Sequence, residues 1–557
     1  MMRSDDPRTW RGLLFLLTLL ALAIYLAEAF ATGPWTIPDD ARQFLAWMPR
    51  LADPQLLRGD LIADYWYSVS PPLYRSLYAI PAAVGISPRT TALLIAVPLL
   101  LLTAMAAWRL CSRMASSPPA AFAAAALMMA WAVQDDSIFS GTPRAFRLPL
   151  VLFFYTGLIE NSIAATLIPL ALLAFLYPAG AVCSFAMLGL SRLHLAPRPG
   201  IDFSRRGLIM VGGGTVLLAA GMFLFDGNLA RWGPTLKLAD LASVPAMAEP
   251  YARSTVVDAD GHLTLLCGGR VGYLPQYLPC RTHAYGVFAF LNLLLFVPML
   301  LAGASALRRR KPDDPDRLFA IVIAATLVCW TIAVAVAFRL HLPSRYSDFL
   351  LRPLELIAIG RAIGGRLVRQ WARTGAKWAA GLLGMALIAL FAIPQTNLIW
   401  PEDPGGTARL ARTPPGTRIA GISIDLNTIP ALAGRSVLAD TEHAIPYQLG
   451  YYRPFHARLA DTATSLRSTD PVVLAGFVRR WQVDVIALAP EVVRDGTLPE
   501  VYRGALPELP ESTGMVPAIA GAPSACRTYQ GPRLLLFDAH CVLAWLQSQA
   551  RLHRPSA

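Results

Sequence analysis

The chain has 557 residues, of which 55% are hydrophobic and 15% charged, with a mean hydropathy of +0.46 and a formal net charge of +13. A soluble protein carries about 25% charged residues, so this composition excludes a soluble globular protein. Arginine supplies almost all of the positive charge, and no soluble basic patch with exposed aromatic residues accompanies it. We therefore expect membrane lipids, and no nucleic acid, as surroundings of the chain.

Long apolar segments recur along residues 1–394, as expected for helices that cross a hydrocarbon core about 30 Å thick. If successive spans alternate in direction from a cytoplasmic N-terminus, the arginine-rich connections lie on the cytoplasmic side and the loops 32–90 and 226–283 lie outside. The spans between 148 and 190 are short, and prolines interrupt them. The segments predict eleven spans, at 13–31, 91–108, 119–134, 148–159, 163–176, 178–190, 208–225, 284–304, 318–338, 350–363 and 378–394.

The loop 32–90 opens on two adjacent acids, Asp39 and Asp40. Apolar residues of the next segment, 41–51, fall on one helical face, which predicts an amphipathic helix lying in the membrane interface. Either acid could cap the free amides at the start of this helix. Alternatively, one of them could accept a proton from an attacking hydroxyl as a general base, and Asp40 is the better candidate.

A segment with the sequence Ser-Pro-Pro-Leu-Tyr, residues 70–74, leads into the second span. The order of these features resembles the GT-C class of membrane glycosyltransferases. The order is a first span, an outer loop that opens on an acidic pair, a helix and then this segment. The likeness is to the protein O-mannosyltransferases and the lipid A aminoarabinose transferase, in which a charged or polar residue commonly precedes the prolines; here it is Ser70. The resemblance implies that a sugar moves from a polyprenyl-phosphate-linked donor to an envelope glycan, lipid or protein acceptor outside the membrane. It also implies that an aspartate of the first outer loop acts on the acceptor, while outer basic residues hold the donor phosphate.

The second outer loop, 135–147, carries both signs of charge. Asp135 and Asp136 could contact the acceptor or hold a divalent metal ion, as in the oligosaccharyltransferases of the class, although no cofactor is certain; the alternative is a solvated loop end. Arg144 and Arg147 suit donor-phosphate binding because a guanidinium offers a planar fork to phosphate oxygens. The alternative is that both arginines reach from a span end to lipid headgroups.

A late outer loop, 339–349, supplies a second candidate site for the donor phosphate. Its preferred pair is Arg345 with Tyr346, whereas His341 alone is more simply a structural residue. Within the following span, Arg352 and Glu355 lie three residues apart and could pair with each other.

The tail 395–557 is expected to form an extracytoplasmic α/β domain, because short apolar runs at 418–422, 436–439, 483–488 and 534–537 alternate with helical patterns. Asp470 precedes proline at the start of a predicted helix, 471–481. Two cysteine pairs, Cys267 with Cys280 and Cys526 with Cys541, fall in segments that come out extracytoplasmic, where disulfides can persist.

These features predict a polytopic α-helical membrane protein of about eleven spans, GT-C-like over 1–394, followed by the tail domain, in the inner (plasma) membrane of a bacterium. The first functional hypothesis is a glycosyltransferase that uses a polyprenyl-phosphate-linked sugar. The second is a transporter or flippase of a lipid-linked substrate, although such proteins often show two related halves and none is evident here. The third is a non-catalytic scaffold of an envelope-assembly complex.

Overall fold

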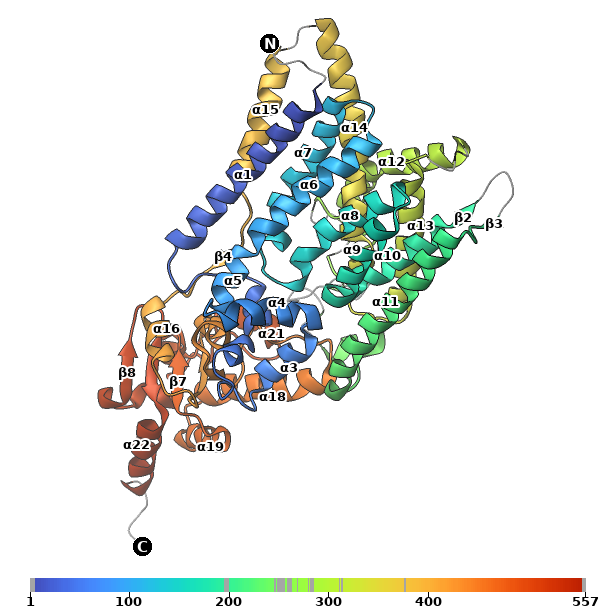
Figure 1. The fold of residues 1–557 in the computed structure, drawn as a ribbon. Helices are drawn as coiled ribbons and strands as arrows, with labels where there is room; N and C mark the ends of the chain where they lie inside the picture. Colours follow the sequence, from blue (N-terminus) through green and yellow to red (C-terminus); the bar gives the residue numbers. More distant parts are fainter. Residues whose placement is uncertain are drawn as a thin grey trace.

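A computed structural model describes most of the chain, and the outer loop 226–283 is described only in part. The described residues are 6–194, 200–244, 247, 256–257, 263–267, 269–278, 280, 285–309, 311, 314–374 and 377–552. Helices fill the upper part of the molecule in Figure 1, and the C-terminal sheet lies at the lower end with the C-terminus. The N-terminus lies at the opposite end of the helical part.

A helix occupies each of the eleven predicted segments. Over the residues that the structure describes, five of these helical stretches are long and apolar enough to cross a membrane by length and composition: Pro7–Ala31, Pro88–Met114, Arg205–Phe225, Gly286–Arg309 and Arg317–Ala335. The chain is thus a multi-pass membrane protein. The helices are α1 (Pro7–Ala31), α5 (Pro88–Leu94) with α6 (Ala96–Met114), α7 (Pro118–Gln134), α8 (Arg147–Ile159), α9 (Ile163–Leu176), α10 (Pro178–Ser191), α11 (Arg205–Leu229), α12 (Tyr285–Arg309), α13 (Arg317–Ala335), α14 (Asp348–Thr374) and α15 (Lys377–Ala392).

Small residues bring α7 and α14 close together. A Cβ placed on Gly360 of α14 would lie 2.5 Å from the Cα of Ala124 in α7, and one on Gly364 would lie 3.1 Å from the Cα of Ala120. Membrane helices associate through such small residues because lipid offers no hydrophobic drive toward helix pairing. These contacts lie in the first two turns of α7, at the end opposite to the one from which the second loop departs.

The segment after Asp39 and Asp40 does not form the predicted interfacial helix. It divides into a short helix, α2 (Ala41–Leu45), and a 3-10 turn, η1 (Met48–Leu51), with proline at its second position. Ala41, Leu45 and Met48 are fully buried within the protein. The apolar face that the sequence assigned to lipid instead packs against the rest of the first outer loop, α3 (Leu61–Val69) and α4 (Pro72–Ala83), and against the tail.

The tail contains a five-stranded mixed sheet with strand order β6-β5-β7-β9-β8. Strands β6 (Ser436–Val437), β5 (Arg418–Ile422) and β7 (Val485–Leu488) are parallel, and β9 (Leu535–Asp538) joins β7 antiparallel. These four strands and the helix α19 (Pro471–Trp481), capped by the side chain of Asp470, confirm the predicted α/β domain. The edge strand β8 (Arg527–Gln530) was not predicted, because its exposed polar residues lack a strand-length apolar run.

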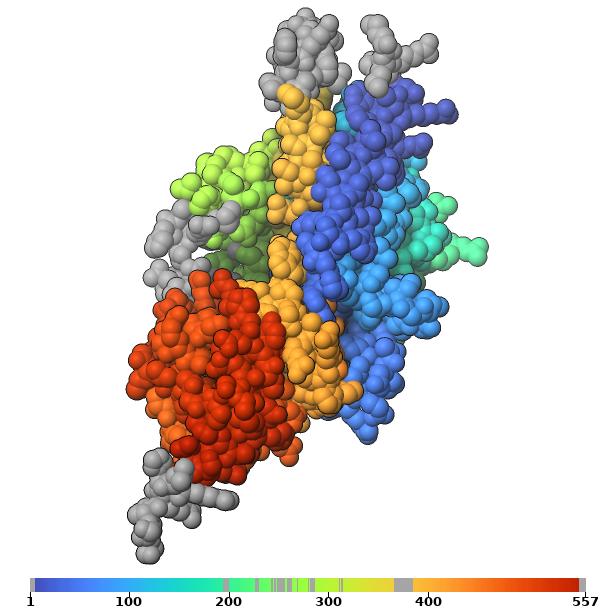
Figure 2. All heavy atoms as spheres, turned by 90° about the vertical axis from the view of Figure 1, so that its left-hand side faces the viewer, coloured from blue at the N-terminus to red at the C-terminus, as the bar shows by residue number. Residues whose placement is uncertain are grey.

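The connection between α15 and the sheet is tied to the first outer loop. Strand β1 (Ile37–Pro38) pairs antiparallel with β4 (Leu398–Ile399), directly before the acidic pair. Disulfides join Cys267 to Cys280 and Cys526 to Cys541, the two pairs named from the sequence. Figure 2 shows the sheet domain lying directly below the helical part on this face of the molecule.

Candidate functional site

Arg144 joins the acids of the first two outer loops. Its Nη2 lies 2.8 Å from Oδ2 of Asp40 and 2.9 Å from Oδ2 of Asp136. Its side chain is 17% exposed, so the two ion pairs act in a partly dehydrated setting, where charge interactions are stronger than in water. The two carboxylates raise the pKa of Arg144 against the opposing effect of burial. One guanidinium thus holds together two segments about 100 residues apart in the sequence.

Arg147 serves the other acid of the second loop. Its Nη2 lies 3.8 Å from Oδ2 of Asp135 and donates to Oγ of Ser137 at 2.8 Å. Burial alone would raise the pKa of Asp135, but the charge of Arg147 and the hydrogen bonds from Ser137 hold it below its ordinary value. The guanidinium also lies over the ring of Phe349, 4.9 Å from its centroid. Arg147 is therefore fixed in one orientation beside an ionised carboxylate.

A third arginine connects this cluster to the sheet domain. Arg42 pairs with Asp39, and its Nη2 lies 2.8 Å from Oε2 of Glu442. The neighbouring Gln43 donates its side-chain amide to the same glutamate at 2.5 Å. Glu442 follows β6 in the tail, so the tail contributes a carboxylate to the site built by the outer loops.

Neither member of the acidic pair acts as a helix cap through its side chain. Asp40 stands at the N-cap position of α2, but its carboxylate makes no capping hydrogen bond there. The Asp39 carboxylate accepts from Arg42 instead of from a backbone amide of the first turn. The capping alternative is therefore wrong for both residues, and the Asp40 carboxylate, one third exposed, is directed at Arg144.

The proline-containing segment before the second span positions the second loop. The hydroxyls of Tyr74 and Tyr78 both donate to the carbonyl of Gly141, that of Tyr74 at 3.0 Å. Gly141 has φ +62°, and a Cβ there would lie 2.8 Å from the Cβ of Ala92, so only glycine suits this turn. Ser70, fully buried, accepts from the indole of Trp47 at 3.1 Å.

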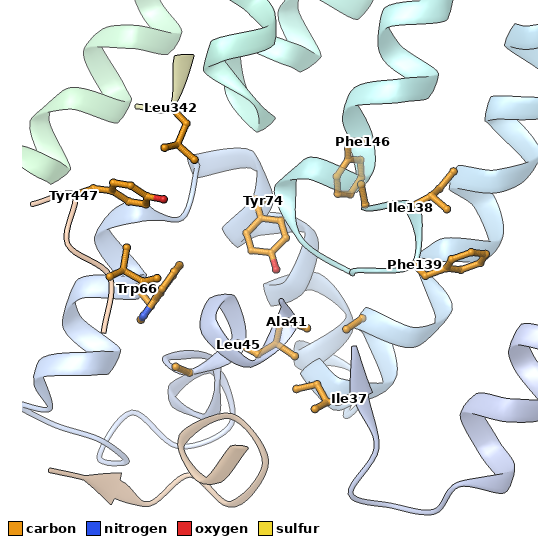
Figure 3. Packing of buried hydrophobic residues seen from close by; sticks show 14 of the residues in the cluster. Ile37, Ala41, Leu45, Trp66, Tyr74, Ile138, Phe139, Phe146, Leu342 and Tyr447 are labelled. Carbon is orange, nitrogen blue, oxygen red and sulfur yellow. The ribbon is translucent and has the colours of Figure 1, made fainter. Parts of the chain in front are cut away.

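Buried apolar side chains pack together between the loops that carry the charged groups. Figure 3 shows Ala41 and Leu45 of the first loop near Tyr74, with Ile138, Phe139 and Phe146 of the second loop beside them and Leu342 and Tyr447 across from them. These residues come from four separate stretches of the chain and are all buried. Such close packing holds these stretches of the chain in fixed positions relative to one another.

The candidate pair of the late outer loop, Arg345 and Tyr346, is not joined to the Arg144 cluster by any ion pair of the described residues. Tyr346 is buried, and its hydroxyl donates to the carbonyl of Leu340 at 2.8 Å. His341 is exposed and its ring packs against Tyr447, while the charges of Arg345 and Arg270 lower the pKa of its imidazole. Among the described residues, no ion pair joins Arg345 to the acids of the first two loops.

The sequence analysis did not assign four residues of this region to the site. Asn397, in the connection to the tail, donates to Oδ2 of Asp136 at 2.8 Å, and its carbonyl accepts from the amide of Asp39. Arg352 pairs with Asp348 at 2.6 Å and adds its charge to that of Arg147 near Asp135. The pairing of Arg352 with Glu355, which its spacing allowed, is not among the ion pairs of the described residues. Arg42 and Glu442 complete the set. The acidic pair directly before Arg42 was the one sequence signal that Arg42 could belong to the site. Its partner Glu442 could not be inferred in this way, because it lies in the tail, far away in the sequence.

The donor set of the cluster favours guanidinium over a metal ion as the bridging cation. Within the part of the chain that the structure describes, no group of three or more histidine, cysteine, aspartate or glutamate side chains is placed to hold a metal. Asp135 and Asp136 point to different arginines, and Arg144 occupies the position between Asp40 and Asp136 that a bridging cation would need. The residues present do not fit the divalent metal site that the sequence allowed.

Comparison with known proteins finds likeness only among solved structures. No protein-family model and no curated protein matches the chain. The archaeal oligosaccharyltransferase AglB from Archaeoglobus fulgidus, solved with an inhibitory peptide and a dolichol-phosphate, is 11% identical over 88% of this chain and 70% of its own, with a TM-score of 0.49. ArnT from Cupriavidus metallidurans bound to undecaprenyl phosphate is 12% identical over 95% of this chain and 98% of its own, with a TM-score of 0.38; its apo form gives 0.41. The chain is similar, at low identity, to solved structures of an archaeal oligosaccharyltransferase and of ArnT.

Proposed function

We propose that the chain is a membrane glycosyltransferase that moves a sugar from a polyprenyl-phosphate-linked donor to an envelope glycan, lipid or protein acceptor at the outer face of the membrane. The observation that carries the proposal is the pairing of Arg144 with Asp40 across two outer loops at 2.8 Å. It joins a carboxylate that can accept a proton to a guanidinium that can bind a phosphate, in one partly buried site.

In this proposal the carboxylate of Asp40 orients the acceptor hydroxyl and takes its proton. The acceptor oxygen forms the new bond to the anomeric carbon while the bond from that carbon to the donor phosphate breaks. The electron pair of the broken bond leaves with the polyprenyl phosphate. Asp39 holds Arg42 in place and Asp136 holds Arg144 in place through ion pairs. The acceptor hydroxyl and the donor phosphate therefore meet charged groups whose positions are fixed.

Arg144 and Arg147 are assigned to the leaving phosphate, because fixed positive charge stabilises the charge that develops there. Arg147 is 6% exposed and packs on Phe349, which supports a preorganised guanidinium with little entropy to lose on binding. We assign Arg345, in the late outer loop, to the donor phosphate as well. Asp135, paired with Arg147, is assigned to positioning and not to metal binding.

The polyprenyl carrier of the sugar explains why the proposed reaction takes place at a membrane. An isoprenoid chain is insoluble in water, so its phosphate must be met at the membrane boundary, where the ends of α7 and α8 hold the second loop. We further propose that residues 1–394 form the membrane domain, that the N-terminus is cytoplasmic, and that residues 395–557 lie outside the inner membrane of a bacterium.

The decisive experiment compares wild type with Asp40→Asn in native cells and in purified membranes. The variant keeps the shape of the side chain but cannot accept a proton, so transfer is expected to fall by about 10²- to 10⁴-fold. The envelope should lose a glycan, and a polyprenyl-linked sugar should accumulate. Both products are measured by mass spectrometry of lipid and envelope extracts.

The matched control is Asp53→Asn in the same outer loop. Asp53 accepts from the backbone amide of Gln55 and takes no part in the cluster, so its loss should leave transfer unchanged. Normal glycans with a normally expressed Asp40→Asn protein would remove the enzyme assignment and leave the transporter or scaffold hypothesis. Loss of transport without accumulation of the linked sugar would favour the transporter.

A further inference from the structure

A second charged recess lies at the end of the helical part away from the sheet domain. It is an open groove of about 560 Å³ between α1 and the last turns of α6. Its charged lining consists of Arg11, Arg109 and Arg113, and its apolar lining includes Phe15, Met105 and Trp108. Ligand sites commonly have volumes of about 300 to 1,000 Å³.

The groove carries an excess of positive charge. Arg109 and Arg113 share one carboxylate, Glu160 at the end of α8, at 2.5 and 3.0 Å. Both arginine side chains nevertheless remain more than half exposed. Among the described residues Arg11 has no ion-pair partner, so three guanidiniums face the groove against a single carboxylate. The two shared ion pairs also hold Arg109 and Arg113 side by side, which preorganises them for an anion.

The apolar part of the groove continues along the membrane-facing surface of the same two helices. Helical spacing puts Arg11, Phe15 and Leu19 on one face of α1, and Leu19 is 52% exposed. On α6, Met105 is 47% exposed one turn from Arg109. Figure 2 shows α1, in dark blue, on the outer surface of the helical part. A ligand in the groove would therefore meet arginines at one end and exposed aliphatic side chains at the other.

We infer that this groove binds the headgroup of an anionic phospholipid from the leaflet on the N-terminal side of the membrane. The arginines receive the phosphate, and the acyl chains lie along the exposed aliphatic residues of α1 and α6. A phospholipid matches both features of the groove, whereas a soluble phosphate compound matches only the arginines. The groove lies at the opposite end of the helices from the Asp40 cluster, so the inference stands independently of the proposed function.

The test uses the purified full-length chain in a neutral detergent, titrated with phosphatidylglycerol or phosphatidylcholine while bound lipid is counted by native mass spectrometry. Phosphatidylglycerol should bind more tightly than phosphatidylcholine. Arg11→Gln or Arg113→Gln should each weaken phosphatidylglycerol binding about fivefold, and the double variant about thirtyfold, because an arginine near an anionic lipid contributes about 1 kcal/mol. Arg11→Lys with Arg113→Lys should restore most of the binding, which separates loss of charge from loss of fold.

Arg308→Gln is the matched control, since it removes an exposed arginine at the end of another membrane helix, α12, outside the groove. It should leave the affinity within about twofold of wild type. Equal binding of the two lipids, an unchanged double variant, or an equal effect of Arg308→Gln would overturn the inference. Saturation of the groove by soluble glycerol 3-phosphate at the same concentration would overturn the assignment to a lipid.

Discussion

The carboxylate of Glu442, in the tail, lies 2.8 Å from the guanidinium of Arg42, in the first outer loop. Arg42 also pairs with Asp39, so the tail is linked by charge to the acidic pair at the centre of the site. Both side chains of the pair are only about one tenth exposed. The tail thus forms one wall of the site, in addition to being a domain attached to the membrane helices.

Glu442→Gln should slow transfer while leaving the fold intact. The amide keeps the shape of the side chain but loses the charge that holds Arg42, and a hydrogen bond to a charged group is worth about 1.5 to 3 kcal/mol. We expect kcat to fall about tenfold to a hundredfold with the KM for the donor little changed. Glu511→Gln, which breaks an exposed pair with Arg503 in the same domain, should have no effect on kcat. A large change in donor KM alone would contradict the positioning role.

Arg144→Lys should be nearly as damaging as loss of the side chain. An ammonium is a point charge and cannot reproduce the planar guanidinium that meets Asp40 and Asp136 together. Removal of one preorganised donor to a developing anion typically costs about 10²- to 10³-fold in kcat. The measurement is initial-rate kinetics in proteoliposomes with a polyprenyl-phosphate-linked sugar. Arg503→Lys, at an exposed pair, is the control, and equal kinetics for both variants would refute the assignment of Arg144.

The site was predictable from sequence to the extent that its chemistry is local. Adjacent acids at 39–40 and 135–136 and arginines at 144 and 147 lie between predicted spans, so their placement in loops followed from the predicted order of helices. Their pairing did not, because Arg144 meets Asp40 only after α1, the first loop and α7 have folded together. Long-range contacts of this kind leave no periodic signal in one sequence.

The failed expectation about the segment after Asp40 has a related cause. Its apolar spacing is the same whether the partner is lipid or protein, and the sequence could not show that the tail would cover it. Residue Arg42, assigned to the polar face, is 9% exposed because Glu442 and Asp39 neutralise it. In the tail, by contrast, the buried parallel strands β5 and β7 have strong local signals, and these elements were predicted within two residues.

Gly141→Ala should destabilise the second outer loop and with it the site. The backbone there has φ +62°, and the new Cβ would lie 2.8 to 3.0 Å from side-chain and backbone atoms of Ala92. Strain and overpacking together should cost about 2 to 4 kcal/mol. Scanning fluorimetry in detergent should show a lower Tm, and transfer should fall. Gly212→Ala in α11, where a Cβ meets nothing within 4 Å, should leave both unchanged.

The tail should become more stable on mild acidification because of Asp425. Burial, with the charges of Glu402 and Asp403, raises its pKa to about 6, although the backbone amides of those two residues donate to it. An unfolded aspartate has a pKa near 3.9, so between pH 4 and 6 the folded state binds more protons than the unfolded state. The free energy of unfolding therefore rises as pH falls through this window, by up to about 3 kcal/mol.

This pH dependence can be isolated by comparing two chains. The Tm of wild type and of Asp425→Asn is measured between pH 4.5 and 7.5 in the same detergent. The Tm of wild type, taken relative to that of Asp425→Asn, should fall as pH rises and the wild-type carboxyl ionises. Asp470→Asn, at an exposed helix cap, provides a carboxylate whose loss should shift Tm without that slope. Parallel curves for wild type and Asp425→Asn would contradict the raised pKa.

The disulfide between Cys526 and Cys541 should hold the last helix of the tail, α22 (Ala539–Leu552), against the edge of the sheet. The cross-link closes a loop with a sequence separation of 15 residues, for which the loss of unfolded-chain entropy corresponds to about 3 kcal/mol. Cys526→Ser with Cys541→Ser should therefore lower the Tm of the tail by several degrees, and a reducing agent should do the same to wild type. The double variant itself should be insensitive to the reducing agent. If the reducing agent left the wild-type Tm unchanged while mass spectrometry showed this bond to be broken, the bridge would contribute nothing to stability.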